Sequence, residues 1–126
     1  MVTGDSLSTG VSIAKEVGII DNEGDASITS NELNKLSNEE VKKLIPRLRV
    51  VARALPEDKK RLVTLAKELN LVTGMTGDGV NDSIALKKAD VSFAMGSGTE
   101  VAKEASDIVI TDDNILSISK AILYGR

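Results

Sequence analysis

The chain has 126 residues, of which 41% are hydrophobic and 28% charged, and its formal net charge is −3. This length and composition fit one folded domain rather than a disordered chain. Aromatic residues make up 2% of the chain, and its 16 lysines and arginines stand among 19 acidic residues. A base-stacking platform and a broadly basic surface are therefore excluded, and we expect no nucleic-acid partner.

The residue types that are missing exclude further chemistry. The sequence contains no cysteine and no histidine. Disulfides, thiolate zinc sites and imidazole acid–base catalysis are therefore excluded, and carboxylate, lysine and hydroxyl groups remain. Because the sequence has neither a signal-peptide pattern nor an apolar run of about 18 residues, we expect this segment neither to be secreted nor to span a membrane.

The first half of the chain predicts strand-to-helix units interrupted by a polar, acidic excursion at about 21–45. The helices are predicted from apolar residues at helical spacing, and Pro56 followed by two acidic residues favours a helix start. The predicted elements are a strand at 1–5, a helix over 8–17, a short helix starting near Asn38, a strand over 49–52 and a helix starting at Pro56.

The second half repeats the same unit. The predicted elements are strands over 72–76, 91–94 and 108–110 and helices over 81–88, 100–105 and about 114–124. Strands alternating with helices of this length predict an α/β fold with a mostly parallel, Rossmann-like sheet and helices on both faces. Ligands bind such sheets at the carboxyl ends of the strands, where the polar turns of this sequence also fall.

The loop from Thr76 to Asp82 is the strongest candidate site. Its sequence, Thr-Gly-Asp-Gly-Val-Asn-Asp, stands between a predicted strand and a predicted helix. The glycines let the backbone approach a ligand, and Asp78 and Asp82 offer the oxygen ligands that Mg²⁺ prefers. The alternative is an ordinary turn, since Asp-Gly turns and Asn caps are common. The length of the segment favours the magnesium site.

Two further residues lie where they can serve a phosphate. Lys59 stands in the first turn of a predicted helix, where its ammonium can neutralise a phosphoryl group. Thr3, at the end of the first strand, can offer its hydroxyl and the neighbouring N–H groups to the same anion. Taken alone, Lys59 also fits a solvated helix face, and Thr3 also fits a helix-capping turn.

Three segments, in this order, resemble the second, third and fourth motifs of haloacid dehalogenase-like phosphotransferases: Met1-Val-Thr-Gly-Asp5, Ala54-Leu-Pro-Glu-Asp-Lys59 and Met75-Thr-Gly-Asp-Gly-Val-Asn-Asp82. The longer stretches 77–90, 94–99 and 105–114 point to a more specific family. They are similar to the phosphorylation domain of P-type cation-transporting ATPases, nearest the calcium-pump-like branch. The resemblance covers the whole chain except the variable excursion at about 21–45.

The resemblance implies that residues 1–126 are the carboxyl-terminal part of a phosphorylation domain, truncated at its N-terminal side. The parent would be an integral membrane pump, with this part on the cytoplasmic side and with nucleotide-binding, actuator and transmembrane domains as partners. In the family, a phosphoryl group passes from Mg-ATP to an aspartate in an Asp-Lys-Thr-Gly-Thr motif, and hydrolysis of the aspartyl phosphate drives transport. The sequence lacks that motif, so we expect the isolated chain to be inactive.

The family's site residues carry over position by position. The resemblance implies that Asp78 is a Mg²⁺ ligand, that Asn81 and Asp82 hold the phosphate loop and orient Asp78 and Lys59, and that Lys59 neutralises the transferred phosphoryl oxygens. It implies that Thr3 and Gly4 hydrogen-bond the phosphoryl group and that Asp5 lies on the nucleotide side. Ser6-Leu7-Ser8 departs from the family pattern. This departure weakens the assignment of Asp5 to the nucleotide side and leaves the assignment of the phosphate site unchanged.

The excursion contains a pattern similar to an EF-hand calcium loop. The oxygen-bearing residues at the ligand positions are Asp21, Glu23, Asp25, Ser27, Thr29 and Glu32. Ala26 stands where the sharp turn requires glycine, and no second EF-hand is present. The resemblance implies a variable surface excursion with a short strand here, around the apolar Ile28, and we therefore do not expect a calcium site.

Two other functions stay open. A soluble phosphatase of the same superfamily shares the Gly-Asp-Gly-x-Asn-Asp loop but needs its own amino-terminal Asp-x-Asp. A non-catalytic module of the same fold would explain the missing nucleophile. The segment 105–114 favours the pump, and hydrophobic spans in the flanking reading frame would decide the matter. Calcium is the ion favoured by the resemblance, whereas sodium, potassium and proton transport stay open because the ion ligands belong to the membrane helices.

Overall fold

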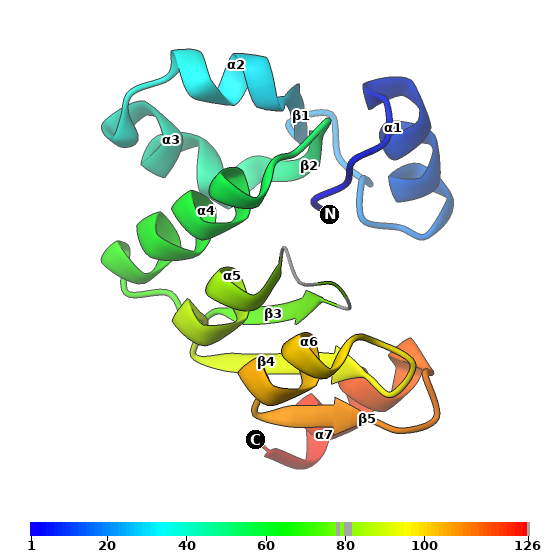
Figure 1. The fold of residues 1–126 in the computed structure, drawn as a ribbon. Helices are drawn as coiled ribbons and strands as arrows, with labels where there is room; N and C mark the ends of the chain where they lie inside the picture. The colour runs from blue at the N-terminus through cyan, green and yellow to red at the C-terminus, as the bar shows by residue number, and fades with distance from the viewer. Residues whose placement is uncertain (78, 80–81, 126) are drawn as a thin grey trace. The chain divides into compact units, whose positions relative to one another are not determined.

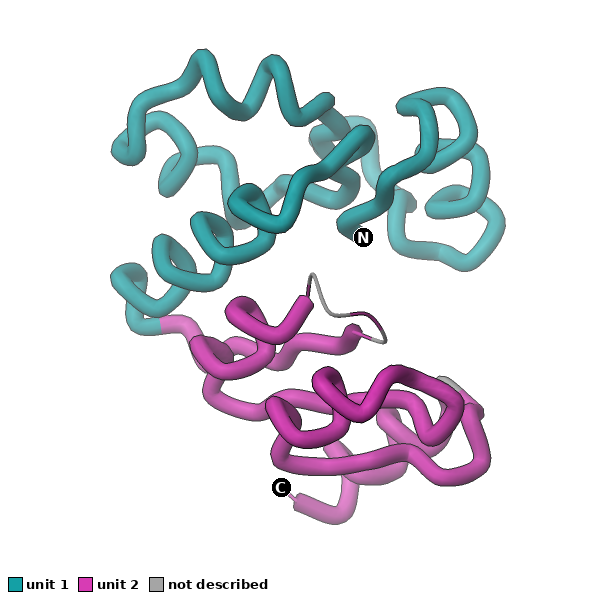
Figure 2. Tube along the Cα trace, viewed as in Figure 1, with its two compact units in different colours: residues 1–70 teal, residues 71–126 magenta. Residues whose placement is uncertain are grey.

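The computed structural model describes residues 1–77, 79 and 82–125, and the chain forms two compact units. Unit 1 comprises Met1–Asn70 and unit 2 comprises Leu71–Arg126 (Figure 2). Each unit is an α/β assembly in which every pair of strands is parallel. The predicted parallel α/β class is therefore confirmed, and the strands lie in two small sheets, one in each unit.

Unit 1 is built around a short parallel pair of strands. Its elements, in chain order, are α1 (Leu7–Glu16), β1 (Ala26–Thr29), α2 (Ser30–Lys35), α3 (Asn38–Leu44), the 3₁₀ helix η1 (Ile45–Arg47), β2 (Leu48–Ala52) and α4 (Pro56–Glu68) (Figure 1). β1 pairs with β2, and Val2 forms an isolated parallel bridge to Val51. The strand predicted at 1–5 is thus reduced to a single bridge beside β2.

Side-chain caps explain where the helices of unit 1 begin. Ser6 caps α1, and its hydroxyl accepts a hydrogen bond from Thr9 N–H. Thr29 and Glu32 form a capping box at the start of α2, and Ser37 and Glu40 form another at the start of α3. Such caps satisfy backbone N–H groups that a helix start leaves without partners.

The polar excursion contributes to the core of unit 1. Leu33 of α2 and Val41 of α3 are fully buried, and they cluster with Val51 of β2 and Leu65 of α4. One apolar side chain from each short helix thus anchors the segment. The excursion is a folded layer that packs on β2 and α4.

Unit 2 has three parallel strands in the order β3 (Gly74–Gly77), β4 (Val91–Met95) and β5 (Ile108–Ile110). Its helices are α5 (Ser83–Lys88), α6 (Glu100–Ala105) and α7 (Ile115–Gly125). Ala94 of β4 packs with residues of α5 and α6, whereas its neighbour Phe93 packs with Ile118 of α7. Because successive strand residues point to opposite faces, the helices cover both faces of this sheet, as predicted.

The boundaries of most predicted elements hold, with two differences besides the missing strand at 1–5. α6 and β5 have the predicted bounds, and β3 begins at Gly74 rather than at Val72. Thr73 is held by the turn before β4, since its N–H and hydroxyl both donate to Asp90 Oδ2, at 2.8 and 3.1 Å. α2 is an additional helix that the sequence analysis does not predict.

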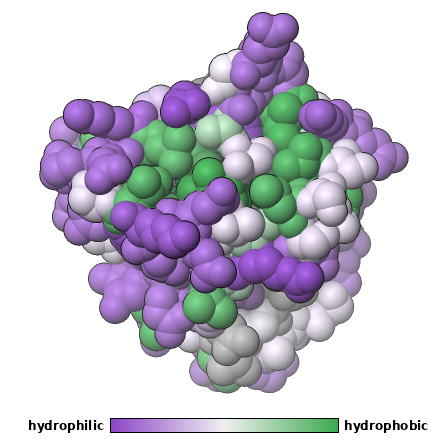
Figure 3. All heavy atoms as spheres, turned by 90° about the horizontal axis from the view of Figure 1, so that it is seen from above, coloured by the Kyte–Doolittle hydropathy of each residue, from purple (hydrophilic) through white to green (hydrophobic). Residues whose placement is uncertain are grey.

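The surface mixes polar and apolar side chains. The face drawn in Figure 3 is largely hydrophilic, with smaller hydrophobic areas between the hydrophilic side chains. Within the described part of the chain, no helix combines the length and the apolar character needed to cross a bilayer.

Candidate functional site

The predicted site residues fall into two groups. Thr3, Gly4, Asp5 and Lys59 belong to unit 1, and Asp82 belongs to unit 2. Asp78 and Asn81 lie outside the described residues. Lys59 comes after β2 and Asp82 comes after β3, each a strand of a parallel pair, whereas the Thr3–Asp5 turn follows the isolated bridge at Val2. An α/β sheet binds its ligands at the ends of such strands.

In unit 1, backbone hydrogen bonds hold the Thr3–Asp5 turn against the link between β2 and α4. Thr3 N–H donates to Val51 O at 2.9 Å, Ala54 N–H donates to Thr3 O at 2.9 Å, and Arg53 N–H donates to Asp5 O at 3.0 Å. The turn and the start of α4 are therefore brought together at the carboxyl end of β2.

The groups of this turn suit an anion. Thr3 Oγ1 accepts a hydrogen bond from Asp5 N–H at 3.1 Å, and this leaves the hydroxyl proton to be donated to a ligand. Gly4 is exposed, and a Cβ placed on it would meet no atom within 4 Å. Packing within the chain therefore does not require glycine there, whereas close approach of a ligand would.

Arg53 is a residue of the turn region that the sequence analysis misses. Its φ of 52° lies in the left-handed region, which is uncommon for a residue other than glycine. Its Nη1 donates to Gly4 O at 3.4 Å, so the side chain reaches back to the turn. The only signal in the sequence was its place directly after the strand.

The start of α4 fixes the backbone that carries Lys59. Pro56 occupies the first helical position, where its missing N–H costs nothing. Asp58 is 2% exposed, and its Oδ2 accepts a hydrogen bond from Leu55 N–H at 2.8 Å. Lys59 follows in the first turn and is half-buried. The predicted helix start is thus confirmed, and a buried carboxylate caps it.

In unit 2, the described part of the predicted phosphate loop is tightly packed around Asp82. The Asp82 side chain is 7% exposed, and its Oδ2 accepts a hydrogen bond from Gly79 N–H at 3.3 Å. A Cβ on Gly77 would lie 2.5 Å from Asp82 Cβ. Gly77 is therefore required by packing against Asp82.

This packing predicts that Gly77→Ala destabilises the chain by about 1–3 kcal/mol, because the new methyl group would overlap the buried Asp82 side chain. Gly4→Ala is the matched control, since its Cβ would meet open space, and we expect its effect to stay within about 1 kcal/mol. Urea unfolding of the two variants and the wild type measures the difference. Equal midpoints for Gly77→Ala and Gly4→Ala would contradict the packing of Asp82 over Gly77.

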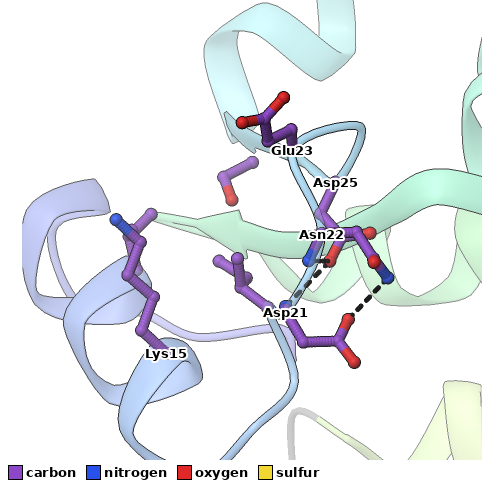
Figure 4. Close-up of a pocket in the computed structure, with 8 residues that line it drawn as sticks. Lys15, Asp21, Asn22, Glu23 and Asp25 are labelled. Atoms are coloured by element: carbon purple, nitrogen blue, oxygen red, sulfur yellow. Dashed lines mark hydrogen bonds between the residues drawn. The ribbon is translucent and has the colours of Figure 1, made fainter.

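Among the described residues, no three acidic side chains gather in a way that could hold a metal ion. The EF-hand-like segment illustrates this. Asp25 Oδ2 accepts hydrogen bonds from the N–H groups of Asp21 and Asn22, both at 3.1 Å (Figure 4), and Asp25 Oδ1 lies 3.1 Å from Arg49 Nε. The Asp21 N–H group, followed by Asn22 N–H and Arg49, holds the pKa of Asp25 below its ordinary value. Both oxygens of the Asp25 carboxylate are therefore engaged by partners within the chain.

The last ligand position of the EF-hand-like pattern is occupied too. Glu32 Oε2 accepts hydrogen bonds from Thr29 N–H at 2.7 Å and Thr29 Oγ1 at 3.1 Å, and these bonds lower the pKa of Glu32. The same residues form β1 and the start of α2. The segment thus folds as strand and helix in place of a calcium loop.

A pocket lies between α1 and the acidic loop at 20–27. It is lined by Val11, Lys15, Ile20, Asp21, Asn22, Glu23, Asp25 and Ser27. Figure 4 shows Lys15 on α1 across from the acidic loop. The predicted phosphate-site residues of unit 1 do not line it.

Comparison with known proteins gives one family and many relatives. The profile of the haloacid dehalogenase-like hydrolases matches residues 59–122. Aligned over its whole length, the chain is 48% identical to calcium-transporting ATPase 1 of Lactococcus lactis and 50% identical to calcium-transporting ATPase 2 of Schizosaccharomyces pombe. The chain spans 14% and 10% of the length of these two relatives.

A solved structure agrees with the sequence relatives. A zinc-transporting PIB-type ATPase in the E2.Pi state superposes with a TM-score of 0.65 and 30% identity, over 94% of this chain and 15% of that one. The chain therefore belongs to the haloacid dehalogenase-like hydrolase family and matches, over its whole length, the phosphorylation domain of P-type calcium-transporting ATPases.

Proposed function

We propose that this chain is the part of a cation pump's phosphorylation domain that binds Mg²⁺ and the phosphoryl group transferred from ATP. The observation that carries the proposal is the pair of hydrogen bonds that join the Thr3–Asp5 turn to residues 53–54, just before α4. Anion-binding N–H and hydroxyl groups are thereby held beside the helix that carries Lys59. Phosphoryl transfer needs this kind of positioned donor and cation around the oxygens.

Each site residue has a role in the proposal. The Lys59 ammonium neutralises the oxygens of the transferred group, and Thr3 and Gly4 donate hydrogen bonds to them. Asp5 faces the nucleotide. In the loop after β3, Asp78 holds Mg²⁺, whose charge offsets that of the phosphate, and Asn81 and Asp82 keep the loop in shape. Carboxylate and amide oxygens are a donor set that fits Mg²⁺.

The parent protein in this proposal is an ATP-driven calcium pump. Calcium is supported by the relatives named above, which are calcium-transporting ATPases. The other domains of the pump, for nucleotide binding, actuation and membrane passage, would be the partners of this chain, which would face the cytoplasm. The soluble phosphatase is less well supported, because the curated relatives over the whole chain are pumps.

The test compares the isolated chain with the full-length protein. We expect the chain to show no turnover of ATP or p-nitrophenyl phosphate, because it contains no Asp-Lys-Thr-Gly-Thr nucleophile. Membranes that contain the full-length protein should hydrolyse ATP with a calcium requirement that a chelator removes. Steady turnover by the purified chain that disappears in Asp78→Ala would overturn the proposal and favour a phosphatase.

A further inference from the structure

We propose that Asp58 is a positioning residue for phosphoryl transfer, which fixes the first turn of α4, and with it Lys59, by hydrogen bonds to α2. The inference rests on the proposed function, since it assigns Lys59 to the phosphoryl group. It also gives a role to the polar excursion, from which α2 comes.

Asp58, Ser30 and Asn34 form a polar triad between α4 and α2. Besides Leu55 N–H, the Asp58 carboxylate accepts hydrogen bonds from Ser30 Oγ at 2.6 Å and from Asn34 Nδ2 at 3.3 Å. Asn34 Nδ2 also donates to Ser30 Oγ at 3.2 Å. Asp58 is 2% and Ser30 4% exposed. A buried carboxylate with donors from two elements ties those elements together, because losing any partner leaves a buried polar group unsatisfied.

Arg61 forms a second tie between the same helices. Its guanidinium donates to Leu33 O at 2.9 Å, to Leu36 O at 2.8 Å and to Asn38 Oδ1 at 3.1 Å. The two carbonyls belong to the end of α2, where the last carbonyls commonly need partners from outside the helix, and Leu33 O also accepts a hydrogen bond from Leu36 N–H at 3.2 Å. Asp58 and Arg61 are three residues apart and share one face of α4. The same face of α4 therefore makes hydrogen bonds to both the start and the end of α2.

The apolar contacts lie on that face too. Leu62 and Leu65 of α4 pack in the cluster formed by Leu33 and Val41 of the excursion. Lys59 follows Asp58 by one residue, which turns it about 100° around the helix axis. The face that carries Asp58 is thus fixed by the excursion, and Lys59 is presented on a different side of the same turn.

The consequence is a mechanical link from the excursion to the phosphoryl site. A displacement of about 1 Å in a catalytic group is enough to slow a reaction many-fold. Replacing the Asp58 carboxylate by an amide would set an NH₂ group against one of three donors and loosen the turn that carries Lys59.

The experiment measures acid-stable phosphoenzyme formation in the full-length protein. Asp58→Asn is compared with Val41→Ala, which opens a cavity in the same cluster without touching the polar triad. Rates are expressed per folded protein and the KM for ATP is recorded. A second pair adds Asp58→Asn to Lys59→Ala, which removes the cation that Asp58 is proposed to position.

We expect Asp58→Asn to slow labelling about tenfold or more, with the KM for ATP changed by less than about twofold. Val41→Ala should label at the wild-type rate per folded protein. If Asp58 acts through Lys59, its replacement should cost less than about twofold in the Lys59→Ala background, where the cation is already absent. Should Asp58→Asn fail to fold, Ser30→Ala replaces it, with an expected loss of about threefold.

Two results would overturn the inference: a wild-type labelling rate in Asp58→Asn, or the same fold loss in the wild-type and the Lys59→Ala backgrounds. Lys59→Ala separates the two failures. If Lys59→Ala labels at the wild-type rate, the proposed function is wrong. If Lys59→Ala is inactive while Asp58→Asn is normal, the positioning role alone is wrong.

Discussion

Replacing Lys59 by alanine in the full-length protein is expected to slow acid-stable labelling from ATP by about a hundredfold or more, the equivalent of about 3 kcal/mol in the transition state. The physical reason is that negative charge on the transferred oxygens would lose the cation proposed to face it. Because α4 is held by Asp58, Arg61 and its apolar face, the substitution should leave the fold intact.

The matched control for this prediction is Lys67→Ala. Lys67 is exposed near the end of the same helix, so its substitution should change stability by less than about 0.5 kcal/mol and leave labelling unchanged. Equal labelling rates in wild type, Lys59→Ala and Lys67→Ala would show that Lys59 does not serve the phosphoryl group. The resemblance would then extend to the fold alone.

Asp78→Asn is expected to abolish labelling at ordinary Mg²⁺ concentrations. The amide keeps the shape of the side chain but removes the negative charge that is proposed to hold the metal. Raising the Mg²⁺ concentration should therefore recover part of the rate, with half-saturation shifted upward by about tenfold or more. The measurement is a Mg²⁺ titration of the labelling rate in membranes that contain wild type or variant.

Glu104→Gln makes the same acid-to-amide change on an exposed residue of α6. Its Mg²⁺ titration should coincide with that of the wild type. A variant Asp78→Asn with wild-type half-saturation would remove Asp78 from the metal site, whatever its effect on the maximal rate.

Local signals explain how much of the fold the sequence predicts. α6 and β5 begin and end where the sequence analysis puts them, because Thr99 caps the helix and a short apolar run makes the strand. The parallel pairing follows from the alternation of strands and helices. These signals act between neighbours in the chain, so the sequence displays them directly.

The elements that the sequence does not predict depend on distant partners. α2 has six residues, and its polar composition hides the single buried Leu33 that packs against α4. The capping box of Thr29 and Glu32 was the one available signal, and the EF-hand-like pattern uses the same two residues. A short helix of this kind exists because tertiary packing supports it, which no local pattern reports.

The candidate site likewise has residues that sequence motifs identify and supporting contacts that they do not. Motif order is enough to propose Thr3, Lys59 and Asp78 from the sequence. The support of the Lys59 helix is not visible there, since Ser30 and Asn34 lie 28 and 24 residues from Asp58 along the chain. The sequence marks Asp58 only as an acidic residue at a helix start, and burial turns it into a link between helices.

The most direct test of the central claim is the chemical nature of the label that the full-length protein takes from ATP. An aspartyl phosphate is an acyl phosphate, which survives acid but is cleaved by hydroxylamine, whereas phosphoserine and phosphothreonine resist hydroxylamine. We expect acid-stable, hydroxylamine-sensitive label that requires Mg²⁺ and calcium and that forms about a hundredfold more slowly in Lys59→Ala. No covalent label during ATP hydrolysis, or label that hydroxylamine leaves in place, would contradict it.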